Sequence, residues 1–112
     1  GRLALDELRD ILKSTDLDED TRVLCMFEHA DILYRSGRYA QSIDAHRVLI
    51  GYPGRIDDAG RALLLLRVGY CQLYDLDDRT AARETLERLT DDRYAKTVAG
   101  KVAAAMLAEE LS

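Results

Sequence analysis

The sequence predicts an all-α fold built from stacked helical hairpins, and three observations support this prediction. Apolar residues recur at helical spacing along most of the chain, and no segment shows the alternation typical of a β-strand. One stretch also repeats: laying Leu33 on Tyr70 and Gly37 on Tyr74 gives an offset of 37 residues both times. A period of this length is typical of repeated helical hairpins. We therefore expect about six helices in the 112 residues.

The first half of the chain contains signals for three helices. Leucine and isoleucine spacing predicts an opening helix over residues 3–13. Asp16, followed three residues later by Glu19, matches a capping box and predicts the start of the second helix. Gly37 is expected to end that helix in the left-handed conformation. The return helix is expected over residues 39–50.

The second half contains signals for three more helices. Pro53–Gly54 is expected to terminate the return helix, and Asp57 or Asp58 to cap the next one. That helix is expected to run to about Tyr74 and is apolar nearly all round, as for a helix covered on several sides. The remaining expected helices cover residues 81–89 and 93–111.

The charge and hydropathy of the chain exclude two classes of partner. The formal net charge is −5, and residues 1–20 hold seven acidic side chains against three basic ones. Because no basic run offers counterion release on a phosphate backbone, we expect no nucleic-acid partner. Unbroken apolar runs such as Ala62–Leu66 are far too short to cross a bilayer. Since the chain opens abruptly at Gly1 and closes in helix-like sequence at Ser112, we expect a fragment of a longer protein, cytoplasmic or periplasmic.

No motif in the sequence indicates catalysis, a cofactor or a metal. There is no Gly-rich phosphate loop, no Gly-x-Ser-x-Gly and no His-Glu-x-x-His, so we expect no enzymatic activity and no cofactor. Cys25 and His29 share a helix face, but a zinc site needs three or four ligands. We interpret His29 and His46 as hydrogen-bonded core histidines and both cysteines as small buried apolar residues. The sequence is also compatible with a disulfide between Cys25 and Cys71.

One segment carries the pattern of a known repeat. It has a small residue in the first helix of a hairpin, a glycine at the turn, a tyrosine two residues later, a small residue in the second helix, then a large residue and a proline. These positions hold Ala30, Gly37, Tyr39, Ser42, His46 and Pro53.

This pattern resembles the tetratricopeptide repeat family, with a degenerate second copy in which Tyr74 takes the place of the turn glycine. The resemblance covers residues 20–111, about two and a half repeats. It implies a right-handed stack of antiparallel hairpins, an α-solenoid, over residues 16–112, after an opening helix within residues 1–15. The spacing near 37 looks like the periplasmic scaffold proteins of the Tol-Pal and outer-membrane-assembly type.

The resemblance implies a function. Members of this family bind a peptide or a neighbouring protein in a groove lined by the first helix, helix A, of each hairpin. We therefore expect a non-catalytic protein–protein interaction scaffold. Phe27 and Asp31 stand where the carboxylate-clamp members carry lysine and asparagine, so that subtype is not expected. The groove residues implied by position are Leu24, Phe27, Asp31, Tyr34 and Arg35 in the first copy and Arg61, Leu64, Val68, Cys71 and Gln72 in the second.

Simpler interpretations remain open for several of these residues. Phe27 and Tyr34 would serve equally well in packing against the opening helix or the second helix of the hairpin. Asp31 and Arg35 are spaced i, i+4 and could form an ordinary surface ion pair. The opening helix is amphipathic enough to fill the groove. The last helix is apolar on more than one side around residues 103–105, which favours an alternative function, homo-oligomerisation through this alanine-rich helix.

Overall fold

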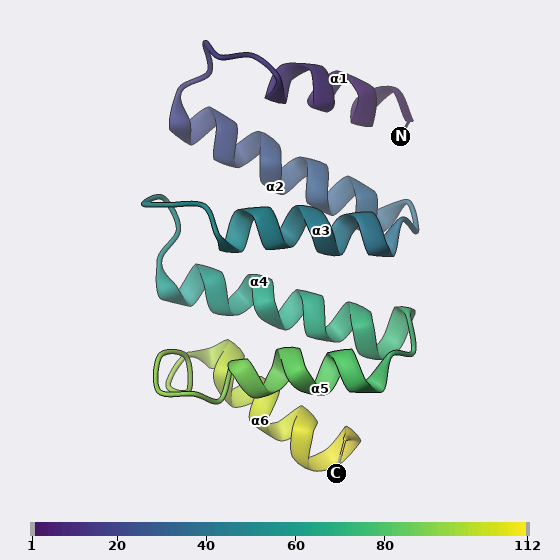
Figure 1. Cartoon of the computed structure of the whole chain (residues 1–112), viewed down its shortest axis with the longest axis vertical. Coiled ribbons are helices and arrows are strands. Elements are labelled where there is room, and N and C mark those ends of the chain that lie inside the picture. Colours follow the sequence, from purple (N-terminus) through teal and green to yellow (C-terminus); the bar gives the residue numbers. More distant parts are fainter. Residues whose placement is uncertain (1, 112) are drawn as a thin grey trace. The chain divides into compact units, whose positions relative to one another are not determined.

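Helices are the regular secondary structure of the chain over the residues that the structure describes. The computed structural model describes residues 2–111, without the side chains of Arg2 and Leu3. Within this range there are six α-helices, one π-helix and no strand, which confirms the predicted all-α class and the predicted number of helices (Figure 1). The elements are α1 (Arg2–Leu12), α2 (Glu19–Arg35), α3 (Tyr39–Ile50), α4 (Asp58–Tyr70), the π-helix η1 (Cys71–Asp75), α5 (Arg79–Arg88) and α6 (Val98–Glu110).

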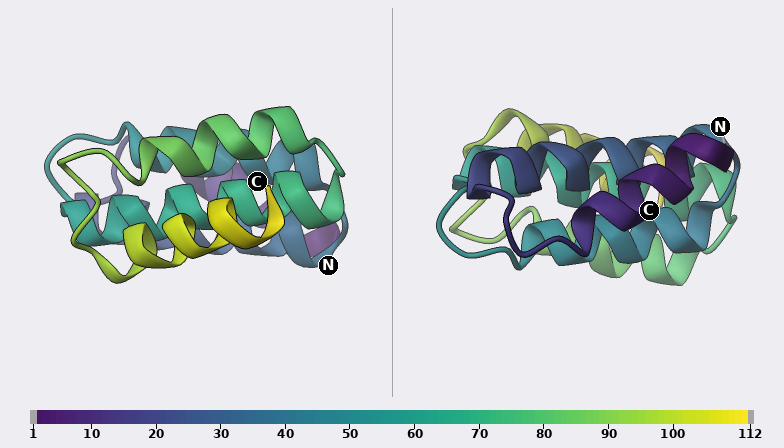
Figure 2. Two further views of the ribbon diagram at one scale, coloured as in Figure 1. Left: turned by 90° about the horizontal axis from the view of Figure 1, so that it is seen from below. Right: turned by 90° about the horizontal axis from the view of Figure 1, so that it is seen from above.

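The helices form two compact units, Gly1–Arg55 (unit 1) and Ile56–Ser112 (unit 2). In unit 1, α2 and α3 form an antiparallel hairpin, and α1 packs on α2 (Figure 1). In unit 2, α4 continues directly into η1, α5 returns antiparallel to α4, and α6 packs on both, as the first view of Figure 2 shows from below. Each unit therefore contains one helical hairpin and one additional helix.

Aspartate side chains begin the first helix of both hairpins. The Asp18 carboxylate accepts a 2.8 Å hydrogen bond from the Thr21 amide, and this bond is the main reason why the pKa of Asp18 is lowered. In α4, Asp57 accepts from the Gly60 amide in the same way, also at 2.8 Å. The expected cap at Asp16 is wrong, because Asp16 lies before the helix and its amide donates to the hydroxyl of Ser14.

The turn after α2 has the predicted geometry. Gly37 has a φ of +78°. Its amide donates to the Tyr34 carbonyl at 3.0 Å, and the Arg38 amide donates to the Leu33 carbonyl at 2.9 Å. This pair of bonds is a Schellman motif, which needs a left-handed residue at the position of Gly37.

The corresponding turn of unit 2 differs from the prediction. Tyr74, expected at the glycine position, lies inside η1, and the left-handed residue is Asp77, with a φ of 51°. The Asp78 amide donates to the Gln72 carbonyl, six residues back rather than five. The extra residue is accommodated by the π-helix, in which bonds span i→i+5.

These positions correct the offset between the two hairpins. The capping residues Asp18 and Asp57 lie 39 positions apart, and the left-handed residues Gly37 and Asp77 lie 40 apart. The offset of 37 deduced from sequence is therefore two residues short along the first helix of the hairpin.

A hydrogen-bonded polar pair joins the two helices of the unit 1 hairpin. The Ser42 hydroxyl donates to the Ala30 carbonyl at 2.8 Å, so the helices approach closely at small residues. The imidazole Nδ1 of His46 lies 2.7 Å from the Ser42 carbonyl, which can only accept, so this nitrogen carries the proton. His46 is buried, which confirms its interpretation as a hydrogen-bonded core residue.

The hairpin of unit 2 is joined at the equivalent place by a glycine. A Cβ on Gly69 would lie 2.7 Å from the Leu86 Cδ2 atom, so any larger residue at this position requires the Leu86 side chain to shift. One turn further on, the Thr85 hydroxyl donates to the side-chain oxygen of Gln72 at 2.6 Å, and both side chains are buried. Gln72 therefore belongs to the interior of the hairpin.

The return helix α3 has the expected bounds and ends at Ile50, before Pro53 is reached. One other boundary differs from that expected. The last helix begins at Val98 rather than near residue 93, because the Thr97 hydroxyl accepts from the Gly100 amide at 3.0 Å and residues 91–97 form turns.

The two left-handed turn residues give a matched test of this geometry. Replacing Gly37 with alanine should lower the free energy of unfolding by about 1 kcal/mol, because a Cβ is strained at positive φ although no atom lies within 4 Å of it. Asp77→Gly should leave the stability unchanged or slightly higher, since it relieves such strain. Urea unfolding followed by circular dichroism measures both. Equal losses in the two variants would contradict the assignment of Asp77 to the turn.

The close approach at Gly69 predicts a loss of stability with a different cause. Gly69→Ala should cost about 1–3 kcal/mol, because the buried Leu86 side chain has no room to move away. Gly51→Ala is the control: Gly51 has an ordinary φ of −85°, and the nearest atom to its added Cβ lies 3.6 Å away. Its stability should change by less than about 0.5 kcal/mol. A tolerated Gly69→Ala would mean that α4 and α5 pack in another register.

Candidate binding surfaces on helices α2 and α4

The residues predicted in the first copy share one face of α2. Leu24 is 65% exposed, Phe27 is half-buried, and the Tyr34 ring packs edge-on against Tyr39 with centroids 5.5 Å apart. Asp31 and Arg35 form an ion pair at 2.9 Å, as the simpler interpretation expected. This exposed pair adds at most a few tenths of a kcal/mol to stability. The face therefore offers one open aliphatic side chain beside a charged pair.

The residues predicted in the second copy do not form an exposed face. Gln72 is held by Thr85 inside the hairpin, and Arg61 is half-buried and donates to the Ile56 carbonyl. The other three are also buried: Leu64, Val68 and Cys71. The prediction for this copy is wrong because its register was two residues short, and two residues turn an α-helix by about 200°.

The corrected register identifies the exposed face of α4. Leu63 and Tyr70 stand 39 positions after Leu24 and Asp31, and Tyr74 stands 39 after Arg35. These three side chains are 54%, 50% and 48% exposed. The rings of Tyr70 and Tyr74 contact each other at 4.6 Å between centroids with an interplanar angle of 52°. We call Leu63, Tyr70 and Tyr74 the tyrosine face.

Sequence reasoning missed the tyrosine face for an identifiable reason. The helix is apolar nearly all round, so periodicity alone does not say which residues point outward. Counting from one aspartate cap to the next, Asp18 to Asp57, would have given the correct register. Each helix has a second aspartate near its start that could also cap it, Asp16 before α2 and Asp58 at the first position of α4, so the capping residue was not evident from sequence.

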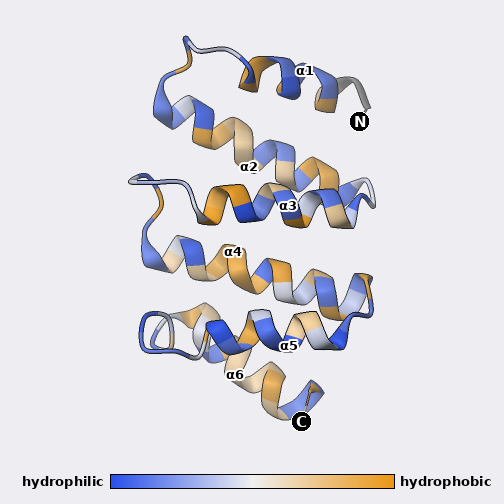
Figure 3. Cartoon of the chain, viewed as in Figure 1, coloured by the Kyte–Doolittle hydropathy of each residue, from blue (hydrophilic) through white to orange (hydrophobic). Residues whose placement is uncertain are grey.

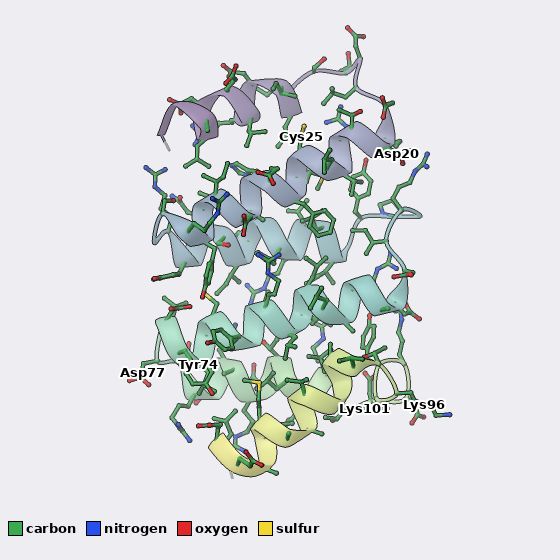
Figure 4. The ribbon with its side chains drawn as sticks, turned by 180° about the vertical axis from the view of Figure 1, so that it is seen from behind. Asp20, Cys25, Tyr74, Asp77, Lys96 and Lys101 are labelled. Atoms are coloured by element: carbon green, nitrogen blue, oxygen red, sulfur yellow. The ribbon has the colours of Figure 1, made fainter. Side chains whose placement is uncertain are left out.

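Acidic groups lie at the end of the tyrosine face. Burial and the neighbouring negative charge of Glu110 raise the pKa of Tyr74, so its phenol is neutral at physiological pH and can donate a hydrogen bond. Asp77 is exposed at the turn that follows, and Figure 4 labels both residues there. This end of the surface therefore combines aromatic rings with carboxylates.

A hollow lies on the opposite side of α2 from the predicted groove residues. It has a volume of about 390 Å³, is open to solvent and is lined by side chains of α1, α2 and α3 within unit 1. His29 lines it and is only half-buried, so its interpretation as a core histidine is wrong; burial first, and then the charge of Arg9, lower its pKa. The other lining residues are Arg9, Leu12, Met26, Leu33, Gln41, Asp44, Ala45 and Val48.

No described residues form a metal-binding group. Among residues 2–111 there is no cluster of three or more His, Cys, Asp or Glu side chains that could hold a metal ion. Cys25 and Cys71 are both free thiols, Cys25 half-buried and Cys71 buried. In the same range, no helix combines the length and apolar character needed to cross a membrane.

Comparison of the chain with protein-family models, curated proteins and solved structures finds no match.

The reactivity of the Cys71 thiol tests which side of α4 is exposed. Burial, followed by the charge of Asp75, raises the pKa of the Cys71 thiol to about 11. At pH 8 the thiolate fraction falls roughly a hundredfold below that of a thiol with the usual pKa of 9.0. In a Cys25→Ser variant, Cys71 should therefore react with a disulfide reagent at least about a hundredfold more slowly in the native chain than in urea. Rapid native labelling would instead restore the original groove prediction for this copy.

Proposed function

We propose that this chain is a non-catalytic protein–protein interaction scaffold of the tetratricopeptide type, binding a peptide or protein segment on the exposed faces of its first hairpin helices. The observation that carries the proposal is the tyrosine face of α4, three large side chains about half exposed on one stripe of a helix. Monomeric proteins rarely leave contiguous large apolar side chains in water without a use for them.

The chemistry of the tyrosine face favours a protein partner. Tyrosine is enriched among the residues that contribute most to binding, since its ring buries a large area and its hydroxyl can still hydrogen-bond. The contact between Tyr70 and Tyr74 orders both rings before a partner arrives, which reduces the entropy lost on binding. Leu24 is the exposed aliphatic residue at the equivalent place on α2.

The negative charge beside the tyrosine face favours a partner segment that carries a basic residue. Asp77 and Glu110 are exposed near Tyr74. A partner segment with apolar anchors and a lysine or arginine at the Tyr74 end would meet complementary charge there. We propose a segment of this composition as the ligand.

The test begins with a photo-crosslinking amino acid placed at position 63 in one preparation and at position 48 in another. Leu63 and Val48 are similarly exposed, 54% and 59%, but Val48 lines the hollow of unit 1. Each preparation is irradiated in lysate of the source organism. A protein crosslinked from position 63 and not from position 48 is then purified, and its affinity for the chain is measured.

The affinity of the purified partner for variants of the chain tests the proposal. Tyr70→Ala should weaken binding about tenfold or more, as expected for a central interface tyrosine, while Val48→Ala should leave the affinity unchanged. Circular dichroism confirms that both variants remain helical. A partner that tolerates Tyr70→Ala but is lost with Val48→Ala would show that the hollow is the binding site and that the tyrosine face is not.

A further inference from the structure

The last helix of the structure exposes a second apolar surface, distinct from the tyrosine face. Val98 is 79% exposed and Val102 40%, the first value being the highest among the exposed large apolar residues of the described chain. Ala105 and Ala108 are exposed on the same side, because residues three and four apart lie on one face of a helix. Figure 3 shows α6 as a largely apolar helix. We call Val98, Val102, Ala105 and Ala108 the α6 face.

The opposite side of α6 is fixed to the rest of unit 2. Ala99 and Ala103 are buried, and α6 packs on α4 and α5. At its carboxyl end, the guanidinium groups of Arg79 and Arg83 donate to the carbonyl oxygens of Glu110 and Leu111. At its amino end, Thr97 caps the helix. Because both ends are held, the α6 face keeps its shape without a partner.

Two oppositely charged side chains stand at equal distances from Ala105 on the α6 face. Lys101 lies four residues before Ala105 and Glu109 four residues after it, and both are exposed. Neither side chain forms an ion pair with the described part of the chain. A helix that carries opposite charges at equal distances from one residue is complementary to a second copy of itself, placed antiparallel about that residue.

We propose that α6 pairs with α6 of a second copy of this chain, antiparallel, around a two-fold axis at Ala105. In this arrangement Lys101 of each copy stands level with Glu109 of the other, and Val102 stands level with Ala108. The small side chain of Ala105 at the axis allows the two helices to approach closely. The proposal goes beyond the interaction scaffold, because it uses a different helix and does not require the tyrosine face.

The size of the surface predicts a weak dimer. A helix of 13 residues is about 20 Å long. One face of such a helix buries less than the roughly 800 Å² per partner of a standard interface. We therefore expect reversible association at micromolar or higher concentration, with the charge pairs setting the orientation more than the affinity.

Charge reversal tests the proposal, with analytical ultracentrifugation over a concentration series as the measurement. The average mass of the wild type should rise from 12.6 kDa towards twice that value. Lys101→Glu and Glu109→Lys should each weaken self-association about tenfold, because each variant places like charges level with one another across the axis. An equimolar mixture of the two variants should recover association, since every chain then meets opposite charges.

Lys96→Glu is the matched control. Lys96 is also an exposed lysine, but it precedes α6 in the turn of residues 91–97, and Figure 4 labels it beside Lys101. This variant should dimerise as the wild type does. Three results would overturn the proposal: a wild type of 12.6 kDa at every concentration, a mixture that associates no better than its components, or loss of self-association with Tyr70→Ala. The last result would assign the dimer contact to the tyrosine face.

Discussion

The close approach between the two helices of each hairpin is the constraint on which the other features depend. In unit 1 the Ser42 hydroxyl reaches the backbone carbonyl of Ala30, and in unit 2 Gly69 lies directly against Leu86. The small residue must face the neighbouring helix, and this sets how each helix is rotated about its own axis. This rotation determines which side chains of the helix are buried in the core and which are exposed to water.

Local signals in the sequence were sufficient for the order and number of helices. Gly37 could be assigned to a left-handed turn because few other residues adopt that conformation cheaply, and the cap at Asp57 was one of two adjacent candidates. The register of the second hairpin could not be obtained in this way. It depends on a π-helix and on a left-handed Asp77, and neither has a signature in apolar periodicity.

A small error of register had a large effect on the predicted site because a helix converts it into rotation. A slip of two residues moved the predicted surface from Leu63, Tyr70 and Tyr74 to the buried side of the same helix. Polarity did not reveal the error. Gln72 has the polarity of a groove residue, yet its amide oxygen accepts a hydrogen bond from Thr85 in the interior, and this pairing makes its burial tolerable.

The two surfaces of unit 2 owe their shape to contacts behind them rather than to a ligand. The tyrosine face is ordered by the contact between its two rings, and the α6 face by arginines of α5 that bind the last carbonyl groups of α6. A surface already in its bound shape loses little conformational freedom on association, so a modest area is enough for measurable affinity. The two faces lie on different helices, and they adjoin where Glu110, the last residue of α6, lies beside Tyr74. A partner on the tyrosine face and a second copy on α6 therefore use different side chains of the same unit.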